Sequence, residues 1–121
     1  MQEAPTVSIL IPAYNEEAYI ESCIKSISSQ DTSFRYEIVV CDDCSTDATP
    51  QILERLDQII SELRTVTNDM NRGIIKTCNR LIETARGKYF VRIDADSRLI
   101  PHSLERIQSN LMGGYSLVFG K

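Results

Sequence analysis

Two aspartates separated by one residue, Asp94 and Asp96, have the side chains and the spacing to hold a hard metal ion. They follow an apolar run at residues 89–93, and residues two apart in an extended chain point to the same side. Mg²⁺ and Mn²⁺ prefer carboxylate oxygens and keep open positions for phosphate oxygens. The pair, with Ala95 between them, therefore predicts a metal bridge to a diphosphate. The alternative is a solvated acidic loop.

Two further polar clusters follow apolar runs. Asp42 and Asp43 end the run at residues 36–41, where an acidic side chain commonly binds a ribose or a base; the alternative is an Asx turn with Ser45 and Thr46. The other cluster, residues 12–17, follows the run at residues 7–11 and contains neither of the glycine-rich loops that cradle phosphates. Without such a loop, a metal ion must hold the phosphates.

Individual residues of these clusters have two interpretations. Tyr14 can stack on a base or fill the rim of a site, and Glu16 can line the site or act only on a helix dipole. Gly73 opens a predicted helix whose N-terminus favours an anion, assisted by Arg72 and Lys76; the alternative is solvated charges. His102, the only histidine, is predicted to lie at the surface.

Strand patterns alternate with helix patterns along the whole chain, which predicts an α/β fold: a three-layer, Rossmann-like, mostly parallel sheet with helices on both faces. The first strand is expected to be central because it is apolar at nearly every position. Asn15 is predicted to cap the first helix, and Cys23 and Cys78 to be buried on helix faces. The strands are expected at residues 7–11, 36–41, 65–67, 89–93 and 115–119.

Ligands of such sheets bind beyond the carboxyl ends of the strands. The three polar clusters lie at those ends, so they are expected to meet on one rim although they are far apart in sequence. This convergence is the main functional signal of the sequence.

Composition excludes several classes of protein. The chain has 121 residues and a net charge of −4, which argues against clamping of nucleic acid through its phosphates. No apolar run is long enough to span a membrane. The four cysteines do not form a disulfide scaffold or a zinc site, and carboxylates inside the CxxC at residues 41–44 disfavour redox chemistry. We expect a reducing, cytoplasmic compartment, or the cytoplasmic face of a membrane for a longer protein.

These motifs resemble those of family 2 glycosyltransferases of the GT-A fold. The resemblance rests on four ordered segments and covers about residues 6–120. The segments are residues 7–17 (VSILIPAYNEE), 42–47 (DDCSTD), 71–79 (NRG with Asn79) and 87–96 (GKY running into IDAD). Two residues depart from the family pattern: Cys44 stands where glycine is usual, and Ser97 where a third acidic residue is common.

The resemblance implies the nucleotide-binding half of a GT-A fold and inverting transfer of a sugar, most often from a UDP-sugar, to an acceptor hydroxyl. Asp94 and Asp96 would hold Mn²⁺ or Mg²⁺, and Asp43 would contact the base. The residues expected to bind the nucleotide-sugar are Pro12, Ala13, Tyr14, Glu16, Asp43, Gly73, Lys76, Asp94 and Ala95.

Family members carry an acceptor-binding half and a catalytic base after the DxD motif. We therefore expect residues 1–121 to be a single donor-binding domain truncated at its C-terminus, inactive alone, with the base beyond Lys121 and an acceptor glycan or lipid bound there. The alternative is a non-catalytic nucleotide-sugar-binding module. A phosphatase resembling the haloacid dehalogenase family also places DxD after a strand, but on its first strand, which disfavours that assignment here.

Overall fold

The structure is a computed structural model that describes residues 4–112. Its four strands form one parallel sheet in the order β3-β2-β1-β4. The strands are β1 (Val7–Ala13), β2 (Tyr36–Asp42), β3 (Leu63–Thr67) and β4 (Tyr89–Arg92). The α/β fold class is confirmed, and so is the central place of the first strand. The strand expected at residues 115–119 lies outside the described residues.

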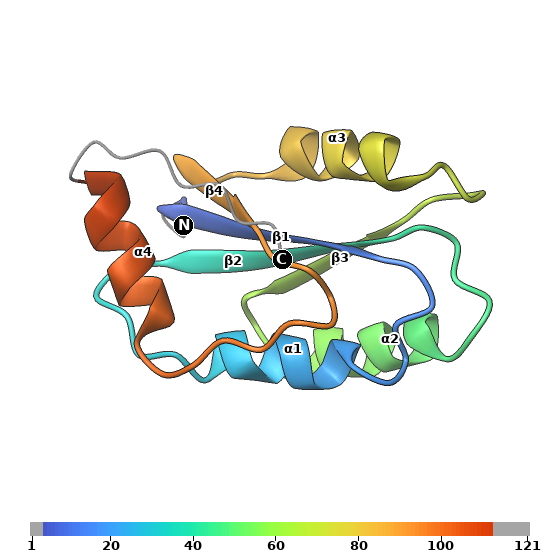
Figure 1. The fold of residues 1–121 in the computed structure, drawn as a ribbon, viewed down its shortest axis with the longest axis horizontal. Helices are drawn as coiled ribbons and strands as arrows, with labels where there is room; N and C mark the ends of the chain where they lie inside the picture. Colours follow the sequence, from blue (N-terminus) through green and yellow to red (C-terminus); the bar gives the residue numbers. More distant parts are fainter. Residues whose placement is uncertain (1–3, 113–121) are drawn as a thin grey trace.

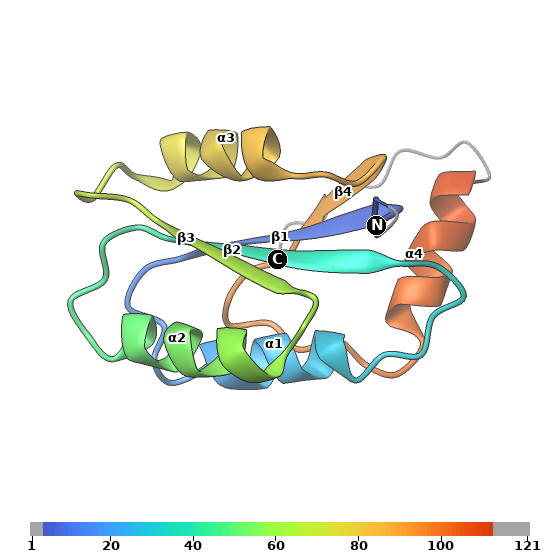
Figure 2. The ribbon, with the colours of Figure 1, turned by 180° about the vertical axis from the view of Figure 1, so that it is seen from behind.

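Helices cover both faces of the sheet (Figures 1 and 2). They are α1 (Ile20–Ser28), α2 (Thr49–Ile59), α3 (Ile74–Thr84) and α4 (Ser103–Met112). Both views show α3 alone on one face, with α1 and α2 on the other. None of the helices in residues 4–112 is long and apolar enough to cross a membrane.

Alternating side chains of β1 build two separate cores. Val7, Ile9 and Ile11 pack in the larger core with α1, α2 and α4, whereas Leu10 packs under α3 with Leu81. Every residue of β1 is buried, because helices cover the strand from both sides. The two cores hold the sheet rigid, and its carboxyl edge can therefore position loops precisely.

Two expectations about the helices are wrong. Asn15 does not cap α1, which begins five residues later at Ile20; the chain turns at Asn15 with a φ of 52° instead. Cys78 is only half-buried, whereas Cys23 is fully buried as expected. The apolar stripe of α3 explains the error, because it is wider than the core beneath it: Leu81 is buried while Ile75 is 74% exposed. His102 is exposed, in agreement with its assignment to the surface.

The amino end of the sheet is closed by a buried carboxylate. Glu37 of β2 accepts hydrogen bonds from the Ser8 hydroxyl, the Arg86 backbone N–H and the Arg64 guanidinium. Gly87 approaches Ser8 so closely that an added Cβ would lie 2.7 Å from the Ser8 backbone nitrogen, and its own N–H donates to the Ser8 hydroxyl. The network ties three strands to the α3–β4 connection.

The Glu37 network predicts a loss of stability in acid. Burial raises the pKa of Glu37, but the hydrogen bonds from Ser8, Arg86 and Arg64 outweigh burial and hold the pKa below its ordinary value of 4.5. A carboxyl with a lowered pKa in the folded state stabilises the fold above that ordinary value, and the stabilisation is lost as the pH falls through the folded-state pKa. We expect Glu37→Gln to cost about 2–3 kcal/mol at pH 7.

Urea unfolding between pH 7 and pH 3 measures this effect. The difference between wild type and Glu37→Gln should shrink as the pH falls below about 4.5. Glu21→Gln is the control, because Glu21 pairs with Arg55 and Lys25 at the surface, and we expect a much smaller loss at pH 7. A difference that stays constant down to pH 3 would contradict the role given to the Glu37 charge.

Cys44 carries backbone strain in the loop after β2. Its φ is 63°, a left-handed conformation that costs a residue with a Cβ about 1–2 kcal/mol. Glycine avoids this cost but loses more entropy on folding, so we expect Cys44→Gly to stabilise the chain by up to about 1 kcal/mol in thermal unfolding. Cys44→Ala removes the thiol and keeps the strain, so it should give no gain. Equal melting temperatures for the two variants would exclude a backbone cause.

Candidate functional site

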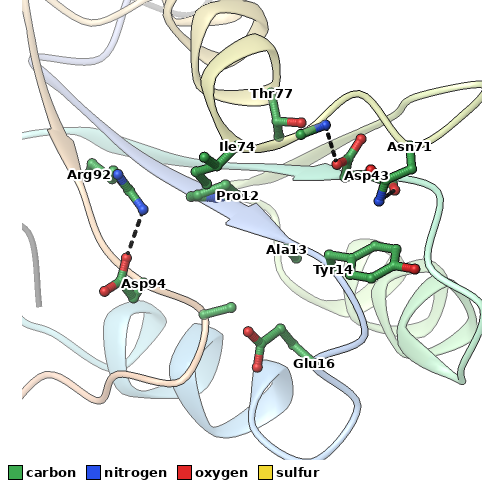
Figure 3. A pocket seen from close by; sticks show the side chains of 12 residues that line it. Pro12, Ala13, Tyr14, Glu16, Asp43, Asn71, Ile74, Thr77, Arg92 and Asp94 are labelled. Carbon is green, nitrogen blue, oxygen red and sulfur yellow. Dashed lines mark hydrogen bonds and ion pairs between the residues drawn. The ribbon is translucent and has the colours of Figure 1, made fainter.

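A cleft of about 440 Å³ opens at the carboxyl ends of β1, β2 and β4. Figure 3 shows that Arg92 and Asp94 lie at one end of it, and that Asp43, Asn71 and Tyr14 lie toward the other. The lining residues come from segments far apart in the sequence: Pro12, Ala13, Tyr14, Glu16, Asp43, Asn71, Gly73, Ile74, Thr77, Arg92, Asp94 and Ala95. The expected meeting of the three polar clusters is therefore observed, with residues of all three in one cleft.

Most of the residues expected to bind a nucleotide-sugar line this cleft. They are Pro12, Ala13, Tyr14, Glu16, Asp43, Gly73, Asp94 and Ala95. Two expected site residues, Lys76 on α3 and Asp96 in the turn after β4, do not line the cleft. Both side chains are exposed.

The β1–α1 loop is shaped by hydrogen bonds to the β2–α2 loop. The Asn15 side-chain oxygen accepts hydrogen bonds from the N–H groups of Thr46 and Asp47, and the Asn15 N–H donates to the Ser45 hydroxyl at 2.8 Å. The N–H of Glu16 donates to the Thr49 hydroxyl at 2.9 Å. These contacts place Tyr14 and Glu16 at the cleft and explain why Asn15 is unavailable as a helix cap.

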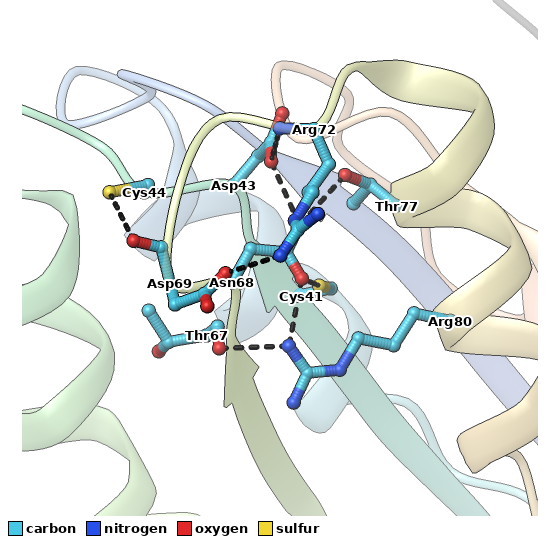
Figure 4. A network of polar contacts seen from close by, with 9 residues as sticks. All are labelled: Cys41, Asp43, Cys44, Thr67, Asn68, Asp69, Arg72, Thr77 and Arg80. Atoms are coloured by element: carbon cyan, nitrogen blue, oxygen red, sulfur yellow. Dashed lines mark hydrogen bonds and ion pairs between the residues drawn. The ribbon is translucent and has the colours of Figure 1, made fainter.

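The two adjacent aspartates after β2 have different roles. Asp42 accepts hydrogen bonds from the N–H and hydroxyl of Ser45, which is the Asx-turn alternative. Asp43 instead turns to the start of α3, where it accepts hydrogen bonds from the backbone N–H groups of Arg72 (2.7 Å; Figure 4) and Gly73 (2.9 Å). The start of α3 therefore already binds a carboxylate of the same chain. The expectation that it attracts a ligand anion with the help of Arg72 and Lys76 is not supported.

The Asp43 carboxylate is ionised and firmly held. Burial raises its pKa, but hydrogen bonds from Arg72, Asn68, Gly73 and Thr77 outweigh burial and hold the pKa below its ordinary value of 3.8. The side chain is 5% exposed and lines the cleft. A preorganised carboxylate of this kind can accept an N–H group from a ligand without moving.

Asn68 locks Asp43 in place, and the sequence analysis did not find it. Its amide nitrogen donates to Asp43 (2.8 Å) and Thr77 (3.1 Å), while its oxygen accepts from Arg80 (2.8 Å) and the Cys41 thiol (Figure 4). Both ends of the amide are satisfied, so its orientation is fixed. The only signal in the sequence is an asparagine directly after the strand predicted at residues 65–67.

The chain turns immediately after Asp94 instead of continuing as a strand. The Ser97 N–H donates to the Asp94 carbonyl at 3.0 Å. The chain is therefore not extended here, and strand alternation does not place the Asp94 and Asp96 side chains on the same side. The two carboxylates nevertheless remain in one neighbourhood. The pKa of the Cys23 thiol rises to about 12 through burial and through the charges of Asp96, Glu16 and Asp94. The Cys23 thiol also donates to the Asp94 carbonyl at 3.6 Å and so supports the turn from α1.

The carboxylates of Asp94 and Asp96 are too few to surround Mg²⁺ or Mn²⁺ by themselves. Within residues 4–112, no group of three or more His, Cys, Asp or Glu side chains is arranged to hold a metal ion. Mg²⁺ typically takes one or two protein carboxylates and completes its shell with waters and substrate phosphates. A metal ion held by Asp94 and Asp96 would therefore need a ligand to supply the rest of its coordination.

Arg92 lines the cleft and was not predicted from the sequence as a site residue. Its guanidinium lies 3.2 Å from the Asp94 carboxylate and forms an ion pair with it (Figure 3). A possible signal was available, because Arg92 interrupts the apolar run between Val91 and Ile93. Ile74 and Thr77 were also missed, because their place in the cleft depends on how α3 packs.

Comparison with known proteins agrees with this geometry. The sequence model described as glycosyl transferase family 2 matches residues 8–121. The chain is 38% identical over 111 residues to an uncharacterized glycosyltransferase of Haemophilus influenzae, covering 92% of this chain and 34% of that protein. It is 36% identical over 105 residues to a chondroitin synthase of Escherichia coli, covering 87% of this chain and 15% of the synthase. The chain thus spans about a third or less of these relatives.

Solved structures give the same result. S. aureus TarS in complex with UDP superposes with a TM-score of 0.80 at 30% identity, covering 89% of this chain and 32% of that one. The mannosyltransferase PcManGT from Pyrobaculum calidifontis, in complex with GDP-Man and Mn²⁺, gives a TM-score of 0.69 at 32% identity, covering 78% of this chain and 28% of that one. The fold is thus the N-terminal part of a GT-A fold, and the chain belongs to glycosyl transferase family 2.

Proposed function

We propose that this chain binds a nucleoside-diphosphate sugar, in particular a UDP-sugar, as the donor of an inverting glycosyl transfer. One observation carries the proposal: a single cleft has a preorganised carboxylate and an aromatic ring toward one end, and the Asp94 carboxylate paired with Arg92 at the other. A nucleoside diphosphate has the matching polarity, with a base at one end and an anionic group at the other.

Each end of the cleft has a proposed partner. Asp43 accepts an N–H of the base, and Tyr14, whose side chain is half-exposed at the cleft, stacks on the base. Asp94 and Asp96 hold Mn²⁺ or Mg²⁺, which neutralises charge on the diphosphate when it is bound. The solved neighbours support this assignment, because TarS is in complex with UDP and PcManGT with GDP-Man and Mn²⁺.

The transfer step is proposed for a longer protein. An acceptor hydroxyl loses its proton to a carboxylate base beyond Lys121 and attacks the anomeric carbon, while the bond from that carbon to the diphosphate oxygen breaks. Acceptors of the longer protein would be glycans or lipids, which the similarity to a chondroitin synthase supports. Residues 1–121 alone should bind the donor without transferring its sugar. Four unpaired cysteines support a reducing, cytoplasmic setting.

Metal dependence tests the proposal most directly. Titration calorimetry with UDP should give at least tenfold tighter binding in Mn²⁺ than in EDTA, because carboxylates and a diphosphate repel each other without a cation between them. Asp94→Asn and Asp96→Asn should each remove most of this difference. Glu54→Gln, an exposed carboxylate on α2, is the control and should retain it. Equal affinity in the two buffers would rule out a metal bridge.

Base recognition is tested separately at Asp43. Asp43→Asn should lower the affinity for UDP about tenfold, and by the same factor in Mn²⁺ and in EDTA, because an ionised acceptor to a base N–H is lost. Binding of inorganic diphosphate in Mn²⁺ is the control and should not change. If the variant lowers the affinities for UDP and for inorganic diphosphate by the same factor, Asp43 acts on the fold of the cleft and does not contact the base.

A further inference from the structure

Arg92 is the one basic side chain that lines the cleft within the described part of the chain. Three carboxylates line the same space: Glu16, Asp43 and Asp94. A cleft that binds an anionic donor needs positive charge, and the protein supplies it at this single position. The guanidinium therefore requires an explanation beyond its ion pair with Asp94.

The position of Arg92 is fixed by its stem. In the sheet, Arg92 of β4 is in register with Leu10 of β1. Its side chain also borders a small apolar cavity of about 60 Å³ beneath α3, together with Leu10, Cys78, Leu81, Ile82 and Phe90. Apolar contacts can hold the methylene groups of an arginine while its charged head reaches a polar site. The methylene groups of Arg92 thus lie beside apolar side chains while its guanidinium faces the cleft.

The guanidinium retains capacity for a ligand. It carries five N–H donors in a planar fork, and one hydrogen bond, of 3.2 Å, joins it to the Asp94 carboxylate. The side chain is 43% exposed, so its remaining donors are accessible. Arginine forks match the paired oxygens of phosphates and carboxylates in geometry as well as in charge.

We propose that Arg92 binds an oxyanion of the donor and competes with the divalent cation for Asp94. This inference rests on the proposed function and adds a protein group to the anion-binding end of the cleft. In the ligand-free chain the guanidinium neutralises Asp94, and on donor binding it turns its free donors to the oxyanion. Two parts of a donor carry such a group: the diphosphate and, in a uronic acid donor, the carboxylate of the sugar.

Arg92→Gln should change two affinities in opposite directions. Removing a positive charge beside Asp94 should tighten the binding of Mn²⁺ alone, measured by electron paramagnetic resonance, at least threefold. The same variant should lower the affinity for the donor in Mn²⁺ about tenfold by calorimetry, and this loss is seen already with UDP if the oxyanion is the diphosphate. Arg98→Gln is the matched control, because Arg98 is exposed and does not line the cleft. It should leave both affinities within twofold of wild type.

The source of the oxyanion follows from comparing donors. A tenfold loss with UDP identifies the diphosphate, whereas a loss seen with UDP-glucuronate but not with UDP or UDP-glucose identifies the sugar carboxylate. Unchanged affinity for all three ligands would overturn the inference. If wild type itself binds none of the three in Mn²⁺, the proposed function fails instead.

A general defect in folding is separated by two further measurements. Uridine lacks the oxyanions, so its affinity should be the same for wild type and Arg92→Gln. Arg92→Lys keeps the positive charge but loses the planar fork of donors. Its affinity for UDP should therefore lie between those of wild type and Arg92→Gln. A loss of uridine binding equal to the loss of UDP binding would show that Arg92 only supports the fold, and would also overturn the inference.

Discussion

The hydrogen bonds from the start of α3 to Asp43 are the interaction on which the cleft depends. Two consecutive backbone N–H groups, from Arg72 and Gly73, converge on one carboxylate at the end of β2. Gly73 has a φ of 91°, a backbone conformation that residues with a Cβ rarely adopt. Because the N-terminus of a helix favours negative charge, Asp43 is ionised and α3 is held against the carboxyl edge of the sheet. One contact thus forms a wall of the cleft and also orients its most buried carboxylate.

A second buried carboxylate, at the opposite end of the same strand, has a different environment. Glu37 is enclosed by Ser8, Arg64 and the Arg86 N–H, and its charge is balanced by the Arg64 guanidinium at 2.7 Å. Asp43 is held by neutral donors, and within residues 4–112 it forms no ion pair with an arginine. The negative charge of Asp43 therefore remains available to a ligand, whereas the charge of Glu37 is neutralised by Arg64. Both carboxylates are buried, so their hydrogen-bonding partners are what distinguishes them.

The sequence was sufficient for the features that depend on local pattern and on parallel topology. The apolar run at residues 7–11 predicted a central strand, and the polar segments after the strands predicted the site, because carboxyl ends of parallel strands share one edge. It was insufficient where contacts join distant segments. Asn15 is held by Thr46 and Asp47, more than thirty residues away, and this loop contact decides its conformation. Likewise, the position of Arg92 follows from its register with β1 and from the packing of α3.

The charge of the cleft couples the proposed donor and the proposed metal to each other. Glu16, Asp43 and Asp94 outnumber the single guanidinium of Arg92, so the lining is net negative and repels an anionic diphosphate by itself. The same lining attracts a divalent cation, but offers it too few protein oxygens to complete a coordination shell. Each ligand therefore supplies what the other lacks. By thermodynamic linkage, the metal must raise the affinity for the donor by the same factor by which the donor raises the affinity for the metal. Arg92 shifts the balance between the two ligands, because a guanidinium beside Asp94 opposes the cation and favours the anion. We therefore expect a cleft with this balance to bind its two ligands together better than either one alone.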